Sequence, residues 1–227
     1  IPPGAARVAH YLLQVPPEAN APVTVEVKLQ YRKFDKQYMD FVTGKAREGD
    51  PPIRGHVRGE PYRNELPITT LAVDRVTFPV AGAAETADNP PRDIPEWQRW
   101  NDYGIGLLLE GKAELRQAAD AFAEVEKLGR YDGPLNLARV FNTEGRLDEA
   151  VAAVGRAAKF TDPAAPPWTL AWLSGLLNRQ QGHLAEAERD FRSVLENSTG
   201  EMRARGFDFS VDIEVINLLG QTLFDQA

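Results

Sequence analysis

The sequence of 227 residues predicts an α+β protein: a small N-terminal antiparallel β segment followed by an all-α helical array. In Val23–Lys33, apolar and polar residues alternate, which is typical of a strand with one buried face. From Trp97 onward the apolar residues recur at helical spacing instead. Glycines at turns between the helices, Gly111, Gly145 and Gly182, are separated by 34 and then 37 residues.

The β segment, residues 1–80, contains three strand candidates. Arg7–Val15 is the first, and a short loop connects it to Val23–Lys33, so we expect these two strands to pair antiparallel. Phe34–Val42 has the spacing of one or two helical turns. Ile68–Val80 is the third strand candidate.

Two irregular stretches divide these elements from one another and from the helices. Residues 43–66 contain many glycines and prolines and form a long loop, either solvated or serving as a docking surface. Residues 81–93 are small, polar and rich in proline, and are expected to act as a linker. The helical domain then occupies residues 94–227.

Helix pairs that recur about every 34 residues are typical of the tetratricopeptide repeat. In the first pair Gly104 is the small residue that lets the second helix approach, and Ala118-x3-Phe122 lies on that second helix. The second pair fits the pattern best, and a third pair follows. After a break at residues 198–200, Ser210 is a candidate N-cap for a last helix that covers the end of the array. The predicted fold is therefore a superhelix of three helix pairs plus a capping helix.

The first helices of such a superhelix line a concave surface that can bind a partner. Carboxamide side chains both donate and accept hydrogen bonds, so they can hold an extended peptide backbone. Arg139 and Arg179 are suited to a carboxylate, and Trp172 to an apolar side chain. The alternative is that these positions contact the protein's own β segment or linker. The candidate partner-binding groove consists of Asn101, Asn136, Arg139, Asn142, Trp172, Arg179, Asn217 and Gln221.

Composition argues against several other classes of function. The net charge of −7 argues against nucleic acid as the main partner, and no apolar run is long enough for a membrane span. The absence of cysteine excludes disulfides, thiolate metal sites and covalent haem c in this chain. His183 and Glu186 share a helix face but are too few to make a metal site. No nucleotide-binding or nucleophile motif is present, so the chain is not expected to be an enzyme.

Several longer motifs resemble those of tetratricopeptide-repeat proteins associated with, and often fused C-terminal to, multihaem c-type cytochromes. In that group a haem-bearing region with Cys-x-x-Cys-His motifs commonly precedes a β segment and helical repeats like these. The motifs that carry the resemblance are Tyr31-Arg32-Lys33-Phe34, Trp100–Leu109, Leu135–Val140, Asn178–Gly182, Gly206–Ser210 and Leu218–Phe224.

The resemblance implies a periplasmic or extracellular setting and a multihaem cytochrome as partner. Because this chain has no cysteine, haem c is expected upstream of Ile1 or on a separate partner, and no cofactor or metal is expected in the chain itself. The first hypothesis is a non-enzymatic scaffold that docks on or assembles with such a cytochrome in an electron-transfer assembly. The alternatives are a peptide-binding adaptor for secretion or chaperone work, and a subunit of a redox enzyme whose catalytic chain is elsewhere.

Overall fold

The computed structural model describes residues 6–45, 48–53, 56–57, 59–60, 66–82, 89–196 and 199–227. The chain divides into two compact units. One unit is Leu12–Pro91, and the other joins the described residues up to Tyr11 to Arg92–Ala227. A β part followed by a helical part makes this an α+β protein, as the sequence predicts.

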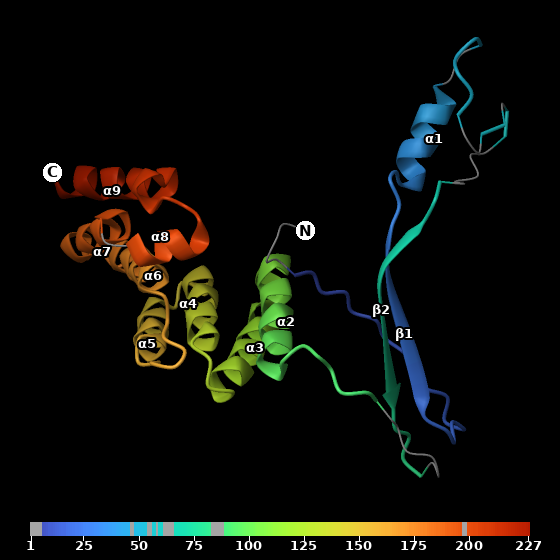
Figure 1. Cartoon of the computed structure of the whole chain (residues 1–227), viewed down its shortest axis with the longest axis horizontal. Helices are drawn as coiled ribbons and strands as arrows, with labels where there is room; N and C mark the ends of the chain where they lie inside the picture. The colour runs from blue at the N-terminus through green and yellow to red at the C-terminus, as the bar shows by residue number, and fades with distance from the viewer. Residues whose placement is uncertain are drawn as a thin grey trace. The chain divides into compact units, whose positions relative to one another are not determined.

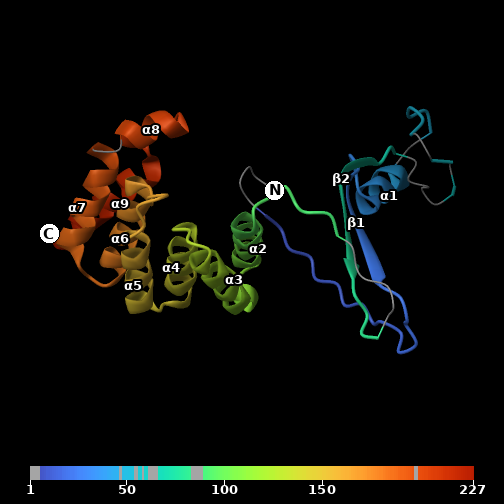
Figure 2. The ribbon, with the colours of Figure 1, turned by 60° about the horizontal axis from the view of Figure 1, so that its bottom comes forward.

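The unit Leu12–Pro91 is built on a two-stranded antiparallel ribbon with a helix at one end (Figure 2). Strand β1 (Val23–Tyr31) pairs with β2 (Thr69–Phe78), and helix α1 (Lys36–Gly44) follows β1. The carboxylate of Asp35 caps α1 by accepting the backbone N–H of Tyr38 at 2.6 Å. The predicted strand at 68–80 and the helical turns at 34–42 are therefore confirmed.

The predicted strand Arg7–Val15 is wrong, and so is its pairing with β1. Residues 6–22 contain no strand, and the partner of β1 is β2. The local pattern of Arg7–Val15 was misleading because its first residues pack elsewhere: Val8 contacts the helical core, and Arg7 pairs with Glu110 at 3.1 Å.

The apolar face of the ribbon is less covered than the alternation predicts. Val23 and Val25 are half-buried, but Val27 and Leu29 are more than half exposed. The long loop begins two residues later than predicted, because α1 extends to Gly44. The other described residues of the loop form no helix or strand. Parts of this loop and of the linker at 81–93 lie outside the described residues.

The helical unit consists of three consecutive hairpins and a terminal group of helices (Figure 1). A short 3₁₀ helix, Lys112–Glu114, lies between the two helices of the first hairpin. The hairpins are α2 (Glu96–Glu110) with α3 (Leu115–Lys127), α4 (Asp132–Glu144) with α5 (Leu147–Ala157), and α6 (Pro167–Gln180) with α7 (Leu184–Glu196). The terminal group is α8 (Thr199–Arg205), a 3₁₀ helix at Phe209–Val211, and α9 (Ile213–Gln226).

Glycines shape these hairpins in two ways. Gly145 ends α4 with φ +78°, a left-handed conformation that disfavours side chains, and its N–H donates to the carbonyl of Asn142 at 3.1 Å. Gly104 instead allows close packing, since a Cβ there would lie 2.6 Å from the ring of Phe122. Gly175 has the same relation to Phe191, at 2.7 Å.

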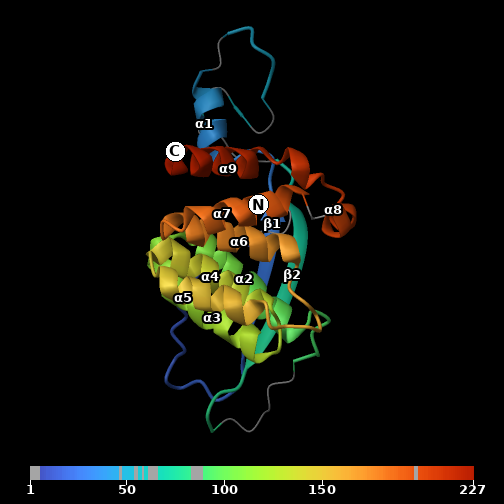
Figure 3. The ribbon, with the colours of Figure 1, turned by 90° about the vertical axis from the view of Figure 1, so that its left-hand side faces the viewer.

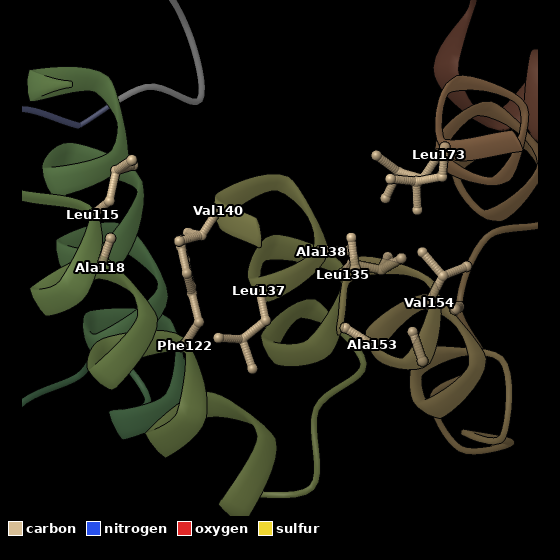
Figure 4. Close-up of a cluster of buried hydrophobic side chains, with 14 of the residues drawn as sticks. Leu115, Ala118, Phe122, Leu135, Leu137, Ala138, Val140, Ala153, Val154 and Leu173 are labelled. Atoms are coloured by element: carbon tan, nitrogen blue, oxygen red, sulfur yellow. The ribbon is translucent and has the colours of Figure 1, made fainter. Parts of the chain in front are cut away.

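The apolar core continues from one hairpin to the next. Figure 4 shows Phe122 of α3 beside Leu137 and Val140 of α4, and Phe122 is completely buried. A second cluster surrounds Phe191 and extends from α6 to α9. Trp172 of α6 packs against both clusters, so it connects the two parts of the core.

The end of the chain differs from the sequence prediction. The break predicted near residue 200 contains a helix, α8. Ser210 is not the N-cap of the last helix: it lies in the 3₁₀ helix, and Asp212 caps α9 by accepting the N–H of Glu214 at 2.9 Å. Figure 3 shows α7 between α6 and α9. Within the described residues, no helix combines the length and apolarity that crossing a membrane requires.

Candidate functional site

A polar pocket with a volume of about 190 Å³ opens among α2, α4, α6 and α8. Three of the eight predicted groove residues lie in it: Asn101, Asn136 and Arg139. We call it the Arg139 pocket. Its other lining residues are Ile105, Tyr131, Asp132, Leu135, Pro166, Thr169 and Arg205.

A chain of hydrogen bonds connects α2 to α4 at this pocket. Asn136 is 5% exposed, and its Nδ2 donates to Oδ1 of Asn101 at 2.8 Å. Its Oδ1 accepts from Nη1 of Arg139 at 2.8 Å. Both ends of the buried carboxamide are therefore satisfied, which holds the guanidinium of Arg139 in place.

Among the described residues, the charge of Arg139 has no ion-pair partner. None of the described carboxylates forms an ion pair with its guanidinium, and Arg139 as a whole residue is partly exposed to solvent. Burial, and then the positive charge of Arg205, lower the pKa of Arg139. A guanidinium still keeps its proton in proteins, so Arg139 stays cationic.

The other charged groups that line the Arg139 pocket are paired. Arg205 pairs with Glu201 at 3.1 Å, and Asp132 pairs with Arg130 at 3.3 Å. Burial, and then the charge of Asp132, raise the pKa of Tyr131, so its hydroxyl stays neutral and available as a donor. Arg139 is therefore the cation of the pocket that no described carboxylate pairs with.

Two predicted groove residues make contacts inside the protein instead. Nη2 of Arg179 donates to Oδ2 of Asp225 in α9 at 3.0 Å, so a carboxylate of the chain itself already occupies it. Trp172 stacks on Trp168, with ring centroids 5.9 Å apart, and also contacts Phe191. Trp172 thus packs against the core and is half-buried, and its role as an anchor for an apolar side chain stays a prediction.

The remaining three groove residues lie outside the Arg139 pocket. Asn142 is half-buried, and its Oδ1 has no hydrogen-bond partner among the described residues. Asn217 and Gln221 are exposed on α9. The predicted groove residues therefore do not share one site in this structure. Three of them line the Arg139 pocket, and the others lie elsewhere on the helices.

Sequence reasoning missed four residues that line the pocket: Tyr131, Asp132, Pro166 and Arg205. Arg205 is brought there by α8, which the sequence prediction treated as a break. A signal was present: Glu201 and Arg205 are four residues apart with opposite charge, a spacing that supports a helix.

The structure offers no cluster typical of a metal site in the part of the chain it describes. No three of the described His, Asp and Glu side chains lie together as metal ligands would. Comparisons with models of protein families, with curated proteins and with solved structures return no match for this chain. The geometry of the pocket is thus what indicates a function.

Proposed function

We propose that this chain is a non-enzymatic, protein-binding scaffold of the tetratricopeptide-repeat type, whose Arg139 pocket binds a carboxylate of a partner protein. The observation that carries the proposal is the guanidinium of Arg139, which is held by buried Asn136 and pairs with no carboxylate among the described residues. An arginine placed in this way forms short, charge-assisted hydrogen bonds to a carboxylate. The amide of Asn101 and the hydroxyl of Tyr131 line the same pocket and can contact the neighbouring peptide backbone.

The repeat assignment is supported by the succession of hairpins. Each of the first helices α2 and α6 places a glycine against a phenylalanine of its second helix. One hairpin cannot bury its apolar face alone, so stacked hairpins share a core, as the two clusters here do. A superhelix of three helix pairs whose first helices face the ligand is the proposed architecture.

The partner we propose is a multihaem c-type cytochrome in a periplasmic or extracellular electron-transfer assembly. The support for it is the resemblance of motifs such as Trp100–Leu109 and Leu135–Val140. Three residues of the second motif line the pocket: Leu135, Asn136 and Arg139. The haem would be carried outside this chain, which has no cysteine.

The second candidate is a peptide-binding adaptor in secretion or chaperone work. The observation in its favour is the same pocket, because a small polar site whose Arg139 pairs with no described carboxylate fits the carboxylate of an extended peptide. The two candidates differ in what the carboxylate is attached to: the surface of a folded cytochrome or a flexible chain.

Fluorescence anisotropy with labelled peptides tests the pocket itself. We expect peptides with a free C-terminal carboxylate to bind at least tenfold more tightly than the same peptides with a C-terminal amide. Arg139→Gln is expected to remove this difference, while Arg116→Gln, exposed on α3, keeps it. Equal binding of acid and amide would contradict the proposed pocket.

Surface plasmon resonance with a purified multihaem c-type cytochrome tests the partner. Binding that Arg139→Gln weakens and that a carboxylate peptide competes away supports the cytochrome assignment. If the peptides bind and the cytochrome does not, the adaptor is the better description. If neither binds, both are wrong.

A further inference from the structure

An apolar pocket with a volume of about 290 Å³ lies between the second and third hairpins, where α5 faces α6. Val154 and Gly155 line it from α5, and Ser174 and Leu177 line it from α6. Val154 and Leu177 are buried, so the pocket reaches from the surface to the core. We call it the Ser174 pocket.

The corresponding interface between the first and second hairpins is filled by large side chains. Figure 4 shows Phe122 of α3 beside Leu137 of α4. Both side chains are buried, at 0% and 5% exposure. An aromatic ring and a branched aliphatic chain thus occupy the space between these two hairpins.

Smaller residues take the same two positions in the next interface. Each second helix has a completely buried alanine followed four residues later by Phe122, Val154 or Phe191. Each first helix has Tyr103, Leu137 or Ser174 directly before the small residue at its centre. Val154 therefore stands where α3 has Phe122, and Ser174 stands where α4 has Leu137. Both of these smaller residues line the pocket.

The two helices have not moved together to close the space that these smaller side chains leave. Between the first two hairpins the backbones approach closely, since a Cβ at Gly133 would lie 2.4 Å from the backbone nitrogen of Glu126. At the Ser174 pocket, a Cβ at Gly155 would meet no atom within 4 Å. Protein interiors are normally packed without such spaces, so the pocket is a distinct feature of this interface.

The pocket also offers polar groups at one place in its apolar lining. The hydroxyl of Ser174 forms no hydrogen bond within the described part of the chain. The carboxamide of Asn178 lines the same pocket, and its Nδ2 donates to Oδ2 of Asp190 at 2.8 Å. A hydroxyl both donates and accepts hydrogen bonds, so Ser174 can bind either a hydroxyl or an amino group.

We propose that the Ser174 pocket binds a free small molecule: an aromatic ring that carries one hydroxyl or amino group. The ring supplies the apolar volume that Phe122 and Leu137 supply in the neighbouring interface, and its polar group bonds to Ser174. Pockets for small molecules are mostly apolar with a few polar groups, and their volumes begin at about 300 Å³. A compound with a single ring fits that lower limit.

A protein partner is a poor occupant for this pocket. Among the described residues from Gly129 to Gly206, Val151 is the only large apolar side chain that is exposed. A stable protein interface buries about 800 Å² on each side around an apolar centre, and the surface around the pocket does not offer one. No residue lines both the Ser174 pocket and the Arg139 pocket, so this inference does not depend on the proposed function.

Methyl NMR of the chain with ¹³C-labelled Val and Leu tests the pocket. The probes are p-cresol and toluene, which differ only in a hydroxyl group. We expect saturable shifts of the methyl groups of Val154 and Leu177, whereas those of Val125, buried in the first hairpin, should not shift. p-Cresol should bind roughly fivefold more tightly than toluene, the factor expected for one hydrogen bond. Ser174→Ala should remove this preference and keep the binding of toluene.

A variant that fills the pocket completes the test. Ser174→Leu introduces the residue that α4 has at this position, so it should abolish binding of both compounds and raise Tm. Ala152→Leu, on the exposed side of α5, should leave binding unchanged.

Three results would overturn the proposal. The first is that neither compound shifts the methyl groups of Val154 and Leu177, which would mean that the pocket is filled or closed in solution. The second is equal affinity of p-cresol and toluene for the native chain. The third is tighter binding of N-acetyltyrosinamide than of p-cresol, which would assign the pocket to a side chain of a protein.

Discussion

At the scale of single residues, the close packing of the hairpins depends on the absence of two side chains. Gly104 and Gly175 each face a completely buried phenylalanine ring at a distance that no Cβ can occupy. Protein interiors are packed too densely to accept an extra methyl group without moving their neighbours. The rings of Phe122 and Phe191 are therefore held in place by the backbone of the helix opposite.

Substituting Gly104 tests this close contact. Gly104→Ala places a methyl group 2.6 Å from the ring of Phe122, so we expect it to lower the free energy of unfolding by about 1–3 kcal/mol. The matched control is Gly155→Ala in α5, where a Cβ meets nothing within 4 Å; alanine should stabilise that helix by about 0.5–1 kcal/mol. Urea unfolding followed by circular dichroism measures both. Equal effects at the two positions would show that the close contact between Gly104 and Phe122 does not contribute to stability.

The site residues show which single positions a sequence can identify. Asn101, Asn136 and Arg139 are predicted from the helical register. They line the same pocket because adjacent hairpins place residues of the same register on the same side. Arg179 and Trp172 had equally good register. Their partners Asp225 in α9 and Phe191 in α7 are chosen by packing between elements, which no local pattern specifies.

At the scale of elements, the ribbon β1/β2 is held by cross-strand pairs as well as by its backbone. Glu26 lies opposite Arg75 and bonds it at 2.7 Å, and Lys28 lies 2.7 Å from the same carboxylate group. The hydroxyls of Thr24 and Thr77, also opposite each other, are 3.0 Å apart. Pairs of this kind fix the register of a ribbon whose apolar face is largely exposed.

The charge pair gives the ribbon a pH dependence with a definite sign. Hydrogen bonds from Arg75, then from Lys28, lower the pKa of Glu26 from 4.5 to about 2. Because the folded state favours the carboxylate, the stabilisation is present above about pH 4.5 and is lost as the pH falls towards 2. The site is exposed, so solvent screening keeps its contribution small.

Carboxyl-carbon NMR of Glu26 measures this directly. We expect a titration midpoint near pH 2 in the native chain, and a shift back towards 4.5 in Arg75→Gln. Arg116→Gln, in the helical unit, should leave the midpoint unchanged. A native midpoint near 4.5 would mean that the pair does not form in solution.

Helix α8 is an element that the local sequence pattern does not predict. It is short, and such helices are marginal without tertiary contacts. Here Glu201 accepts the backbone N–H of Trp168 at 2.8 Å, which caps the first turn of α6 and anchors α8 on it. The contact connects segments far apart in the sequence, so no local pattern beyond one charge pair predicts a helix at residues 199–205.

At the scale of the whole molecule, the N-terminal residues belong to the helical unit. Residues up to Tyr11 group with Arg92–Ala227, although the ribbon unit lies between them in sequence. Val8 packs against the core of the first hairpins, and a Cβ at Gly106 would lie 2.6 Å from its side chain. The segment covers part of α2, at the end of the array where no earlier hairpin is described.

A charge at Val8 tests whether this segment stabilises the array. Val8→Asp places a carboxylate against apolar side chains, so we expect the helical unit to lose about 1–3 kcal/mol. For a chain of this length, each kcal/mol lost lowers Tm by roughly 2–4 °C. Leu12→Asp is the matched control, since Leu12 is 93% exposed. Thermal unfolding followed at 222 nm (a helix signal) should separate the two variants, and equal Tm values would contradict the covering role.

The sequence by itself determined the class α+β, the second and third strand candidates, the helix pairs and three residues of the pocket. All of these depend on periodicity and on short-range chemistry, which a single stretch of chain contains. The tertiary structure decided that β1 pairs with β2 and not with residues 7–15, that Arg205 enters the pocket and that Arg179 is already paired. It also decided that, among the described residues, nothing covers the apolar face of α9 around Gly220, because the burial of a helix face depends on which other element covers it.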